Sequence, residues 1–221
     1  MKRPSARTVQ LAAIVLLGVL ITVLLPLSFP SGGGPTGFDR VVDGRIHSAL
    51  DAHPAVLRVL VTPSDAYVVL PVMLAGVLWY AWRRDWWRAG FLFLAPELVV
   101  ALNTFALKYV WHRHLHHYLA YPSGHTVQFM AIAAGFVLVA PTARIRIAET
   151  VVAAVLLVAI AIGMVGLGYH YPTDILGGTA TAIALTTALY AVLTAARPDV
   201  FSPGRTAGSP RSRTTPATPP R

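Results

Sequence analysis

Long apolar runs separated by short polar segments dominate the hydropathy pattern of this chain. A run of about 20 residues forms a helix about 30 Å long, which matches the thickness of the hydrocarbon core of a bilayer. Six runs reach or approach this length, so the pattern predicts an all-α, polytopic membrane protein, a bundle of six transmembrane helices. Their approximate bounds are 10–29, 65–82, 89–107, 123–140, 147–168 and 175–195.

The first apolar run also has to be weighed as a cleaved signal peptide, because Lys2, Arg3 and Arg7 precede it. It is longer than the apolar part of a signal peptide. Pro26 and Pro30 stand where a cleavage site with small residues would be expected. We therefore interpret this run as the first transmembrane helix.

A different pattern follows the glycine-rich turn at residues 31–35. Apolar residues recur there at the spacing of a helix, with charged residues on the opposite face. This predicts an amphipathic helix at residues 38–50, which lies on the membrane surface or packs against the bundle. Its apolar positions are Phe38, Val41, Val42, Ile46 and Leu50, and its charged positions are Asp39, Arg40, Asp43 and Arg45.

The composition agrees with a bilayer environment. Of the 221 residues, 55% are hydrophobic and only 12% are charged, which excludes a soluble domain with an ordinary solvated surface. The formal charge of +9 does not indicate nucleic-acid binding, because the basic residues are scattered between the apolar runs and form no single stripe. Residues 198–221 are rich in Pro, Ser, Thr and Arg and are predicted to form a disordered basic tail.

The distribution of basic residues predicts which loops face the cytoplasm. Of the 18 lysines and arginines, 13 lie in the two terminal segments and in the loops after the second and fourth spans, and 5 lie in the other loops. The positive-inside rule then places both termini on the cytoplasmic side of a cell membrane, which we interpret as a bacterial plasma membrane. The chain divides into an N-terminus at 1–9, a membrane domain at 10–197 and a cytoplasmic tail at 198–221.

Residues 122–125 read Pro-Ser-Gly-His and stand directly before the fourth apolar run. Ser123 is a favourable N-cap, and Pro122 stops the helix from extending backward. The free N–H groups of the first helical turn and the positive end of the helix dipole together attract anions. The block therefore predicts a phosphate-sized anion site at the outer side of the membrane.

Ionisable residues on the same predicted face complete a site for phosphoryl transfer. Lys108 and Arg113 precede the anion site, and His170 and Asp174 follow it at a spacing that puts both on one side of a helix. A histidine held by a carboxylate can act as a nucleophile, a second histidine can protonate the leaving oxygen, and cations stabilise the phosphoryl oxygens. We predict that this chemistry uses no cofactor.

Four histidines in one loop allow a second interpretation, since clustered imidazoles bind zinc, copper or nickel. They are His112, His114, His116 and His117, and no carboxylate or cysteine accompanies them in the loop. We therefore interpret the loop as a solvated, basic rim of the phosphate pocket and predict no metal site.

At these residues the chain resembles the phosphatidic acid phosphatase type 2 superfamily of membrane lipid phosphatases. The family pattern combines a Lys/Arg motif, a Pro-Ser-Gly-His motif and a Ser-Arg-x5-His-x3-Asp motif, and the resemblance covers residues 108–178. The second motif is complete, and the third keeps the half that contains His170 and Asp174. Gly163 and Met164 replace the Ser-Arg of the third motif, and Leu115 and His116 replace an Arg-Pro of the first.

The resemblance implies a role for each matching residue. His170 would attack phosphorus to form a phosphohistidine, Asp174 would orient its ring, and His125 would protonate the leaving group. The substrate would be a membrane lipid with a phosphate or diphosphate monoester, such as an isoprenoid diphosphate or a phosphatidic-acid-type lipid. Phosphate oxygens would be held by Lys108, Ser123, Gly124 and Arg113, of which Arg113 matches an additional arginine found in some members.

The two replaced arginines leave alternatives open. A member without them could bind a lipid phosphate with weakened catalysis, or serve a structural role in the membrane. A transporter is a third interpretation, but the predicted spans lack paired broken helices. If the chain is an enzyme, we expect Arg113, aided by protonated His114 or His116, to supply the missing charge, which would favour activity on the acidic side of neutrality.

Overall fold

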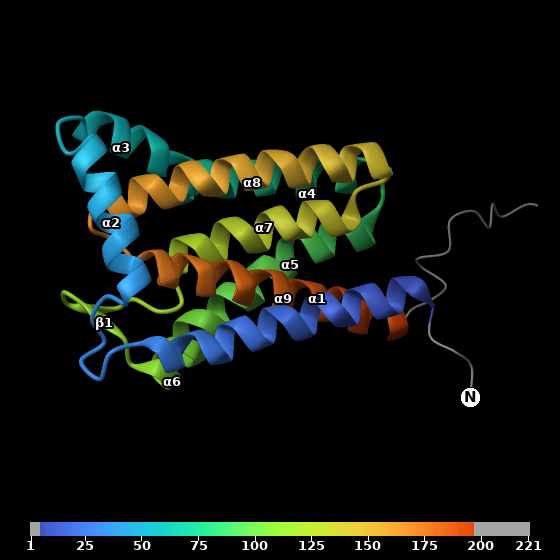
Figure 1. Ribbon diagram of the computed structural model, residues 1–221. Coiled ribbons are helices and arrows are strands. Elements are labelled where there is room, and N and C mark those ends of the chain that lie inside the picture. Colours follow the sequence, from blue (N-terminus) through green and yellow to red (C-terminus); the bar gives the residue numbers. More distant parts are fainter. Residues whose placement is uncertain (1–4, 197–221) are drawn as a thin grey trace, which may run out of the picture.

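The computed structural model describes residues 5–196, so the expectations for the first four residues and for the tail after residue 196 lie outside the described residues. Long helices lie side by side as a bundle (Figure 1). Within the described residues, five helical segments are long and apolar enough to cross a membrane, one fewer than the six predicted, and the prediction of an all-α polytopic membrane protein is confirmed. These segments are Ala6–Ser28, Pro54–Trp82, Trp86–Trp111, Ala143–Gly166 and Pro172–Ala196.

The elements follow the predicted runs, with shifts of a few residues at their ends. The first helix begins earlier than predicted because the Ser5 hydroxyl caps it by accepting a hydrogen bond from the backbone N–H of Thr8. In chain order the elements are α1 (Ala6–Leu24), the short helix Leu25–Ser28, α2 (Gly37–Leu50), α3 (Pro54–Val61), the short helix Thr62–Ser64, α4 (Ala66–Trp82), α5 (Trp86–Leu102), the π-helical turn Asn103–Leu107, α6 (Lys108–Trp111), β1 (His114–Leu115), β2 (Tyr118–Leu119), α7 (Gly124–Val139), α8 (Ala143–Gly166) and α9 (Pro172–Ala196).

Helix α2 forms where the amphipathic helix was predicted, but its faces differ from the prediction, because Asp39 faces inward. Its first turn is closed by a capping box, in which the Thr36 hydroxyl accepts from the N–H of Asp39 and the Asp39 carboxylate accepts from the N–H of Thr36. The helix lies across one end of the bundle and contacts α8 and α9 (Figure 1). Phe38 and Val41 remain exposed on its other face, while Asp39 is fully buried.

Helix α7, the fourth predicted span, is shorter than the other spans and lies at the centre of the bundle. It has 16 residues and packs against α5, α8 and α9. Val127 and Ala131 on this helix are fully buried, and they belong to the main apolar core, to which α4, α5, α8 and α9 also contribute. Packing on three sides therefore holds the start of α7, where the anion site was predicted.

A small antiparallel hairpin, which the sequence did not predict, lies between α6 and α7. In it His114 is opposite Leu119, and Leu115 is opposite Tyr118. The hairpin lies at the same end of the bundle as α2 and α3 (Figure 1). Its turn contains His116 with a φ of 53°, a left-handed value that histidine adopts more often than most residues.

Candidate active site

A cavity of about 1040 Å³ is formed where α5, α6, the hairpin, the start of α7 and the segment before α9 meet. Four of the seven predicted site residues line it, namely Lys108, Gly124, His125 and His170. These residues come from distant parts of the sequence, so helix packing has brought them together as predicted. The remaining walls are formed by Val100, Thr104, Tyr109, His112, His114, His117, Tyr118, Leu119, Gln128 and Tyr169.

The start of α7 differs from the prediction in how its cap is made. Ser123 occupies the N-cap position, but its hydroxyl accepts a hydrogen bond from the Thr126 hydroxyl at 3.0 Å and makes no side-chain cap. Ser123 is fully buried, and its own N–H donates to the carbonyl of Asp174 at 3.1 Å. The first turns of α7 and α9 are thus joined, and the N–H groups of the α7 turn that begins at Gly124 have no side-chain cap competing with an anion.

Lys108 approaches the start of α7 from the opposite wall. It directly follows the π-helical turn Asn103–Leu107, a type of turn that occurs frequently at functional sites. Its ammonium donates a hydrogen bond to the carbonyl of Leu119 in the hairpin. A Cβ atom added to Gly124 would lie 4.0 Å from the Nζ atom of Lys108. A lysine ammonium and the positive end of α7 therefore face the same small volume.

His170 and Asp174 lie together, as their spacing predicts. The Nδ1 atom of His170 is 3.6 Å from Oδ2 of Asp174, close enough for electrostatic attraction but longer than a hydrogen bond. The ring of Tyr118 stands edge-on to the imidazole, with 5.8 Å between the ring centroids. A carboxylate on the Nδ1 side favours the tautomer in which Nε2 carries the lone pair, which suits Nε2 as the reacting atom.

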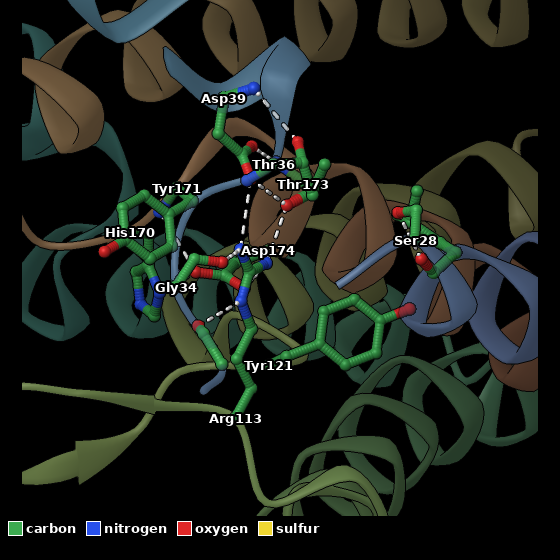
Figure 2. A network of polar contacts seen from close by, with 12 residues as sticks. Ser28, Gly34, Thr36, Asp39, Arg113, Tyr121, His170, Tyr171, Thr173 and Asp174 are labelled. Atoms are coloured by element: carbon green, nitrogen blue, oxygen red, sulfur yellow. Dashed lines mark hydrogen bonds and ion pairs between the residues drawn. The ribbon is translucent and has the colours of Figure 1, made fainter. Parts of the chain in front are cut away.

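Arg113 lies in a different place from the one predicted for a phosphate-binding residue. It is only 1% exposed and is not among the residues that line the cavity. A guanidinium has five N–H groups, and here each donates to a protein oxygen, so none is left for a phosphate (Figure 2). Nε donates to Gly33 O at 3.1 Å, Nη1 to Thr173 Oγ1 at 2.6 Å and Asp174 Oδ1 at 2.8 Å, and Nη2 to Gly34 O at 2.9 Å and Asp39 Oδ2 at 3.0 Å.

Asp39 contacts Arg113 beside the cavity, whereas its position in the sequence predicted only a place on the charged face of the amphipathic helix. Burial by itself would raise the pKa of Asp39, but hydrogen bonds from Thr36, Thr173 and Arg113 lower that pKa below its ordinary value, so the carboxylate is charged at neutral pH. The spacing of Thr36 and Asp39 is a capping-box signal that could have located the helix start. It carries no information about Arg113, 74 residues further along the chain.

The two positions at which the chain departs from the family pattern lie away from the phosphate site. Met164 is fully buried in the apolar core with Val61 and Ile160. Leu115 is half-buried in the hairpin and does not line the cavity. Within residues 5–196, Lys108 is consequently the only lysine or arginine in the cavity wall.

Histidines supply much of the remaining polar wall. Of the loop histidines, His112, His114 and His117 line the cavity, whereas His116 does not. The Nδ1 atom of His114 lies 2.9 Å from the carbonyl oxygen of His112. Because a carbonyl can only accept, Nδ1 must carry a proton, and Nε2 is left to take up a second one. Within residues 5–196, no group of three or more His, Asp or Glu side chains is arranged to hold a metal ion.

Comparison with known proteins shows which family the cavity-lining part of the chain resembles. The family model of the PAP2 superfamily matches residues 102–198, the part of the chain that carries all seven predicted site residues. This match confirms the family resemblance predicted from the motifs for that part of the chain. No curated protein matches the chain.

One solved structure shares the fold. It is described as the crystal structure of the first transmembrane PAP2 type phosphatidylglycerolphosphate phosphatase from Bacillus subtilis. The two chains are 20% identical, with a TM-score of 0.59, and the alignment covers 84% of this chain and 96% of that chain. The likeness extends beyond residues 102–198 and therefore includes helices that the family model does not match.

Proposed function

We propose that this protein is an integral membrane lipid phosphatase that hydrolyses a phosphate or diphosphate monoester at an extracytoplasmic site. The observation that carries the proposal is the convergence of His170, His125, Lys108 and the start of α7 on one cavity. They provide a nucleophile, a proton donor and positive electrostatic potential, which are the groups that phosphoryl transfer requires.

In the proposed reaction, Nε2 of neutral His170 attacks phosphorus while the bond between phosphorus and the leaving oxygen breaks. His125 gives its proton to that oxygen, and Lys108 with the N–H groups of α7 stabilises the equatorial oxygens. Asp174 stabilises the positive charge that develops on the imidazole of His170. Water then attacks the phosphohistidine, His125 accepts its proton, and the bond between nitrogen and phosphorus breaks to release inorganic phosphate.

The position of the cavity in the bundle supports a lipid substrate at the outer membrane face. Large apolar side chains are exposed along α1, α4 and α8, as expected of helices that contact lipid. The basic loops between α4 and α5 and between α7 and α8 lie at the end of the bundle opposite the hairpin (Figure 1). If these loops are cytoplasmic by the positive-inside rule, the cavity faces outward.

The first test is phosphate release by intact spheroplasts that express the chain. We expect inorganic phosphate to be released from short-chain phosphatidic acid or isoprenoid diphosphate added outside the cells, and release should persist with a chelator because the proposed nucleophile is a histidine. Release that begins only after the cells are permeabilised would overturn the outward orientation. Complete dependence on an added divalent ion would overturn the mechanism, and no release from any lipid in either preparation would overturn the phosphatase.

The second candidate function is a protein that binds lipid phosphate with weak turnover. It is favoured by Met164, which stands where the family pattern has an arginine and is buried in the apolar core. Without an arginine in the cavity wall, the equatorial oxygens lack a bidentate donor, and losing one such group often costs about 10²–10³ in rate. Saturable binding of the same lipids by the purified protein without phosphate release would support this candidate over the enzyme.

We further propose that loop histidines supply part of the missing positive charge. The sequence predicted this role for His114 or His116, but His116 lies outside the cavity wall, whereas His114 and His117 line it. We therefore assign the role to His114 and His117. An imidazole gains its charge between about pH 8 and 5, so this contribution grows as the pH falls below neutrality. It would complement Lys108, whose ammonium borders the same volume.

The pH profile of the double variant His114→Asn/His117→Asn tests this proposal. We expect it to lose activity selectively on the acidic side of neutrality, by about tenfold, relative to the wild type. His116→Asn is the matched control, because it removes an imidazole from the same hairpin outside the cavity, and asparagine tolerates the left-handed φ at that position. Superimposable profiles for the double variant and the wild type would refute the contribution of these histidines.

A further inference from the structure

Four buried residues form a polar cluster beside the cavity, and we call Asp39, Arg113, Thr173 and Asp174 the Arg113 cluster (Figure 2). None of the four is more than 3% exposed. The guanidinium lies between two carboxylates, with Nη2 at 3.0 Å from Oδ2 of Asp39 and Nη1 at 2.8 Å from Oδ1 of Asp174. The cluster therefore connects helix α2 to the first turn of α9.

Asp39 is bound on both of its oxygens. Oδ1 accepts from the N–H of Thr173 at 2.9 Å, and Oδ2 accepts from the hydroxyl of Thr173 at 2.9 Å and from the N–H of Thr36 at 2.8 Å. The Thr173 hydroxyl in turn accepts from Nη1 of Arg113. A buried carboxylate is tolerated only where such bonds replace water, so the orientation of Asp39 is strongly determined by its surroundings.

Asp174 divides its two oxygens between the Arg113 cluster and the reaction site. Oδ1 accepts from Arg113, while Oδ2 accepts from the N–H of Tyr171 at 3.0 Å and lies 3.6 Å from Nδ1 of His170. Without Asp39, Arg113 would lose its second carboxylate, and Nη2 would keep only the carbonyl of Gly34 as an acceptor, so the guanidinium would be held less firmly against Asp174. The position of Asp39 is therefore transmitted to His170 through two intervening side chains.

Charge adds to this geometric effect. With both carboxylates ionised, the two acids and one guanidinium leave one net negative charge beside His170. His170 lies beside Asp174 of α9 and Tyr118 of the hairpin. The other titratable groups of the shared cavity wall are Lys108, Tyr109, His112, His114, His117, His125 and Tyr169. A negative cluster stabilises the imidazole when it becomes positively charged, as it does on attacking phosphorus.

We propose that Asp39 is a positioning residue of the phosphatase reaction, which acts through Arg113 and Asp174 to hold and polarise His170. Asp39 lies on α2, outside the segment matched by the family model, so the surface helix completes the active site. The inference rests on the proposed function, because the reaction it serves is the hydrolysis described above. It also explains why Arg113 is fully bonded to protein and leaves the phosphate to Lys108 and α7.

The test compares Asp39→Asn with the wild type in full-length protein, using short-chain phosphatidic acid as the probe. We expect kcat to fall about 10- to 100-fold with little change in KM, because the nucleophile and not the substrate is misplaced. The acidic limb of the pH profile of kcat/KM should move to lower pH, because removing a negative charge makes protonation of His170 less favourable. Asp43→Asn is the matched control, since it changes an exposed carboxylate one turn further along α2 and should leave both quantities unchanged.

A second variant keeps the proposal testable if Asp39→Asn does not fold. Thr173→Val keeps every charge and removes only the hydroxyl that links Arg113 to Asp39, so we expect a several-fold lower kcat and an unmoved acidic limb. A folded Asp39→Asn protein with the kcat and acidic limb of the wild type would overturn the inference, as would an unchanged kcat in Thr173→Val if Asp39→Asn fails to fold. If the wild type itself releases no phosphate, the proposed function fails and the positioning role falls with it.

Discussion

Replacing His170 by alanine is expected to lower phosphate release by at least about 10³-fold, the largest effect of any single change in the cavity. In the proposed reaction its side chain supplies the atom that forms the bond to phosphorus, and without it the remaining groups can only assist a slow direct attack by water. His170 is 5% exposed and lies beside Asp174 and Tyr118.

The measurement for His170→Ala is steady-state phosphate release, together with labelling of the protein by a substrate that carries radioactive phosphate. A phosphohistidine survives alkali and is lost in acid, so the wild type should keep an alkali-stable label that the variant lacks. His53→Ala is the control, because His53 is exposed at the start of α3 and its side chain makes no cap. Wild-type turnover by His170→Ala would rule out the phosphohistidine route.

Gly177→Ala is expected to destabilise the fold by about 1–3 kcal/mol, even though alanine is the better helix former. A Cβ atom at Gly177 would lie 2.0 Å from the Cε2 atom of Tyr121. Tyr121 cannot move aside easily, because it is fully buried and its hydroxyl donates to the carbonyl of Thr22 at 2.7 Å. Phe29 and Trp111 also stand edge-on to its ring, at centroid distances of 5.1 and 5.3 Å.

The matched control for this prediction is Gly90→Ala on α5. No atom lies within 4 Å of a Cβ added there, so only helix propensity acts, and the variant should be more stable than the wild type by up to about 1 kcal/mol. Thermal unfolding in detergent measures both variants. Equal or higher stability of Gly177→Ala would show that α9 does not pack against Tyr121 as described.

The sequence predicted the features that depend on neighbours along the chain. Apolar run length located the membrane segments, and helical periodicity located α2, because both are properties of a single helix. The pairing of His170 with Asp174 followed in the same way, since residues four apart lie on one face of a helical turn whatever surrounds it. The anion site predicted at the start of α7 rests on a helix terminus, which is also a local feature.

The motifs could not determine which side chains of the loop at 112–119 reach the substrate. The hairpin directs His114 and His117 into the cavity wall and leaves His116 outside it, although all three lie within four residues. Strand pairing and two left-handed residues set these directions, and single-residue preferences for such a short hairpin are weak.

Tertiary structure alone decided the place of Arg113. The family resemblance predicted that Arg113 would bind phosphate. In the fold its guanidinium instead contacts Asp39, which is 74 residues earlier, and Asp174, which is 61 residues later. Asp39 in turn bonds to Thr173, 134 residues away. These contacts form because α2 packs across the end of the bundle against α9. A local sequence pattern does not predict which helix ends will contact each other. The sequence by itself therefore determined the membrane helices and the histidines that line the cavity, whereas the packing of α2 against α9 decided which charged side chains lie beside His170.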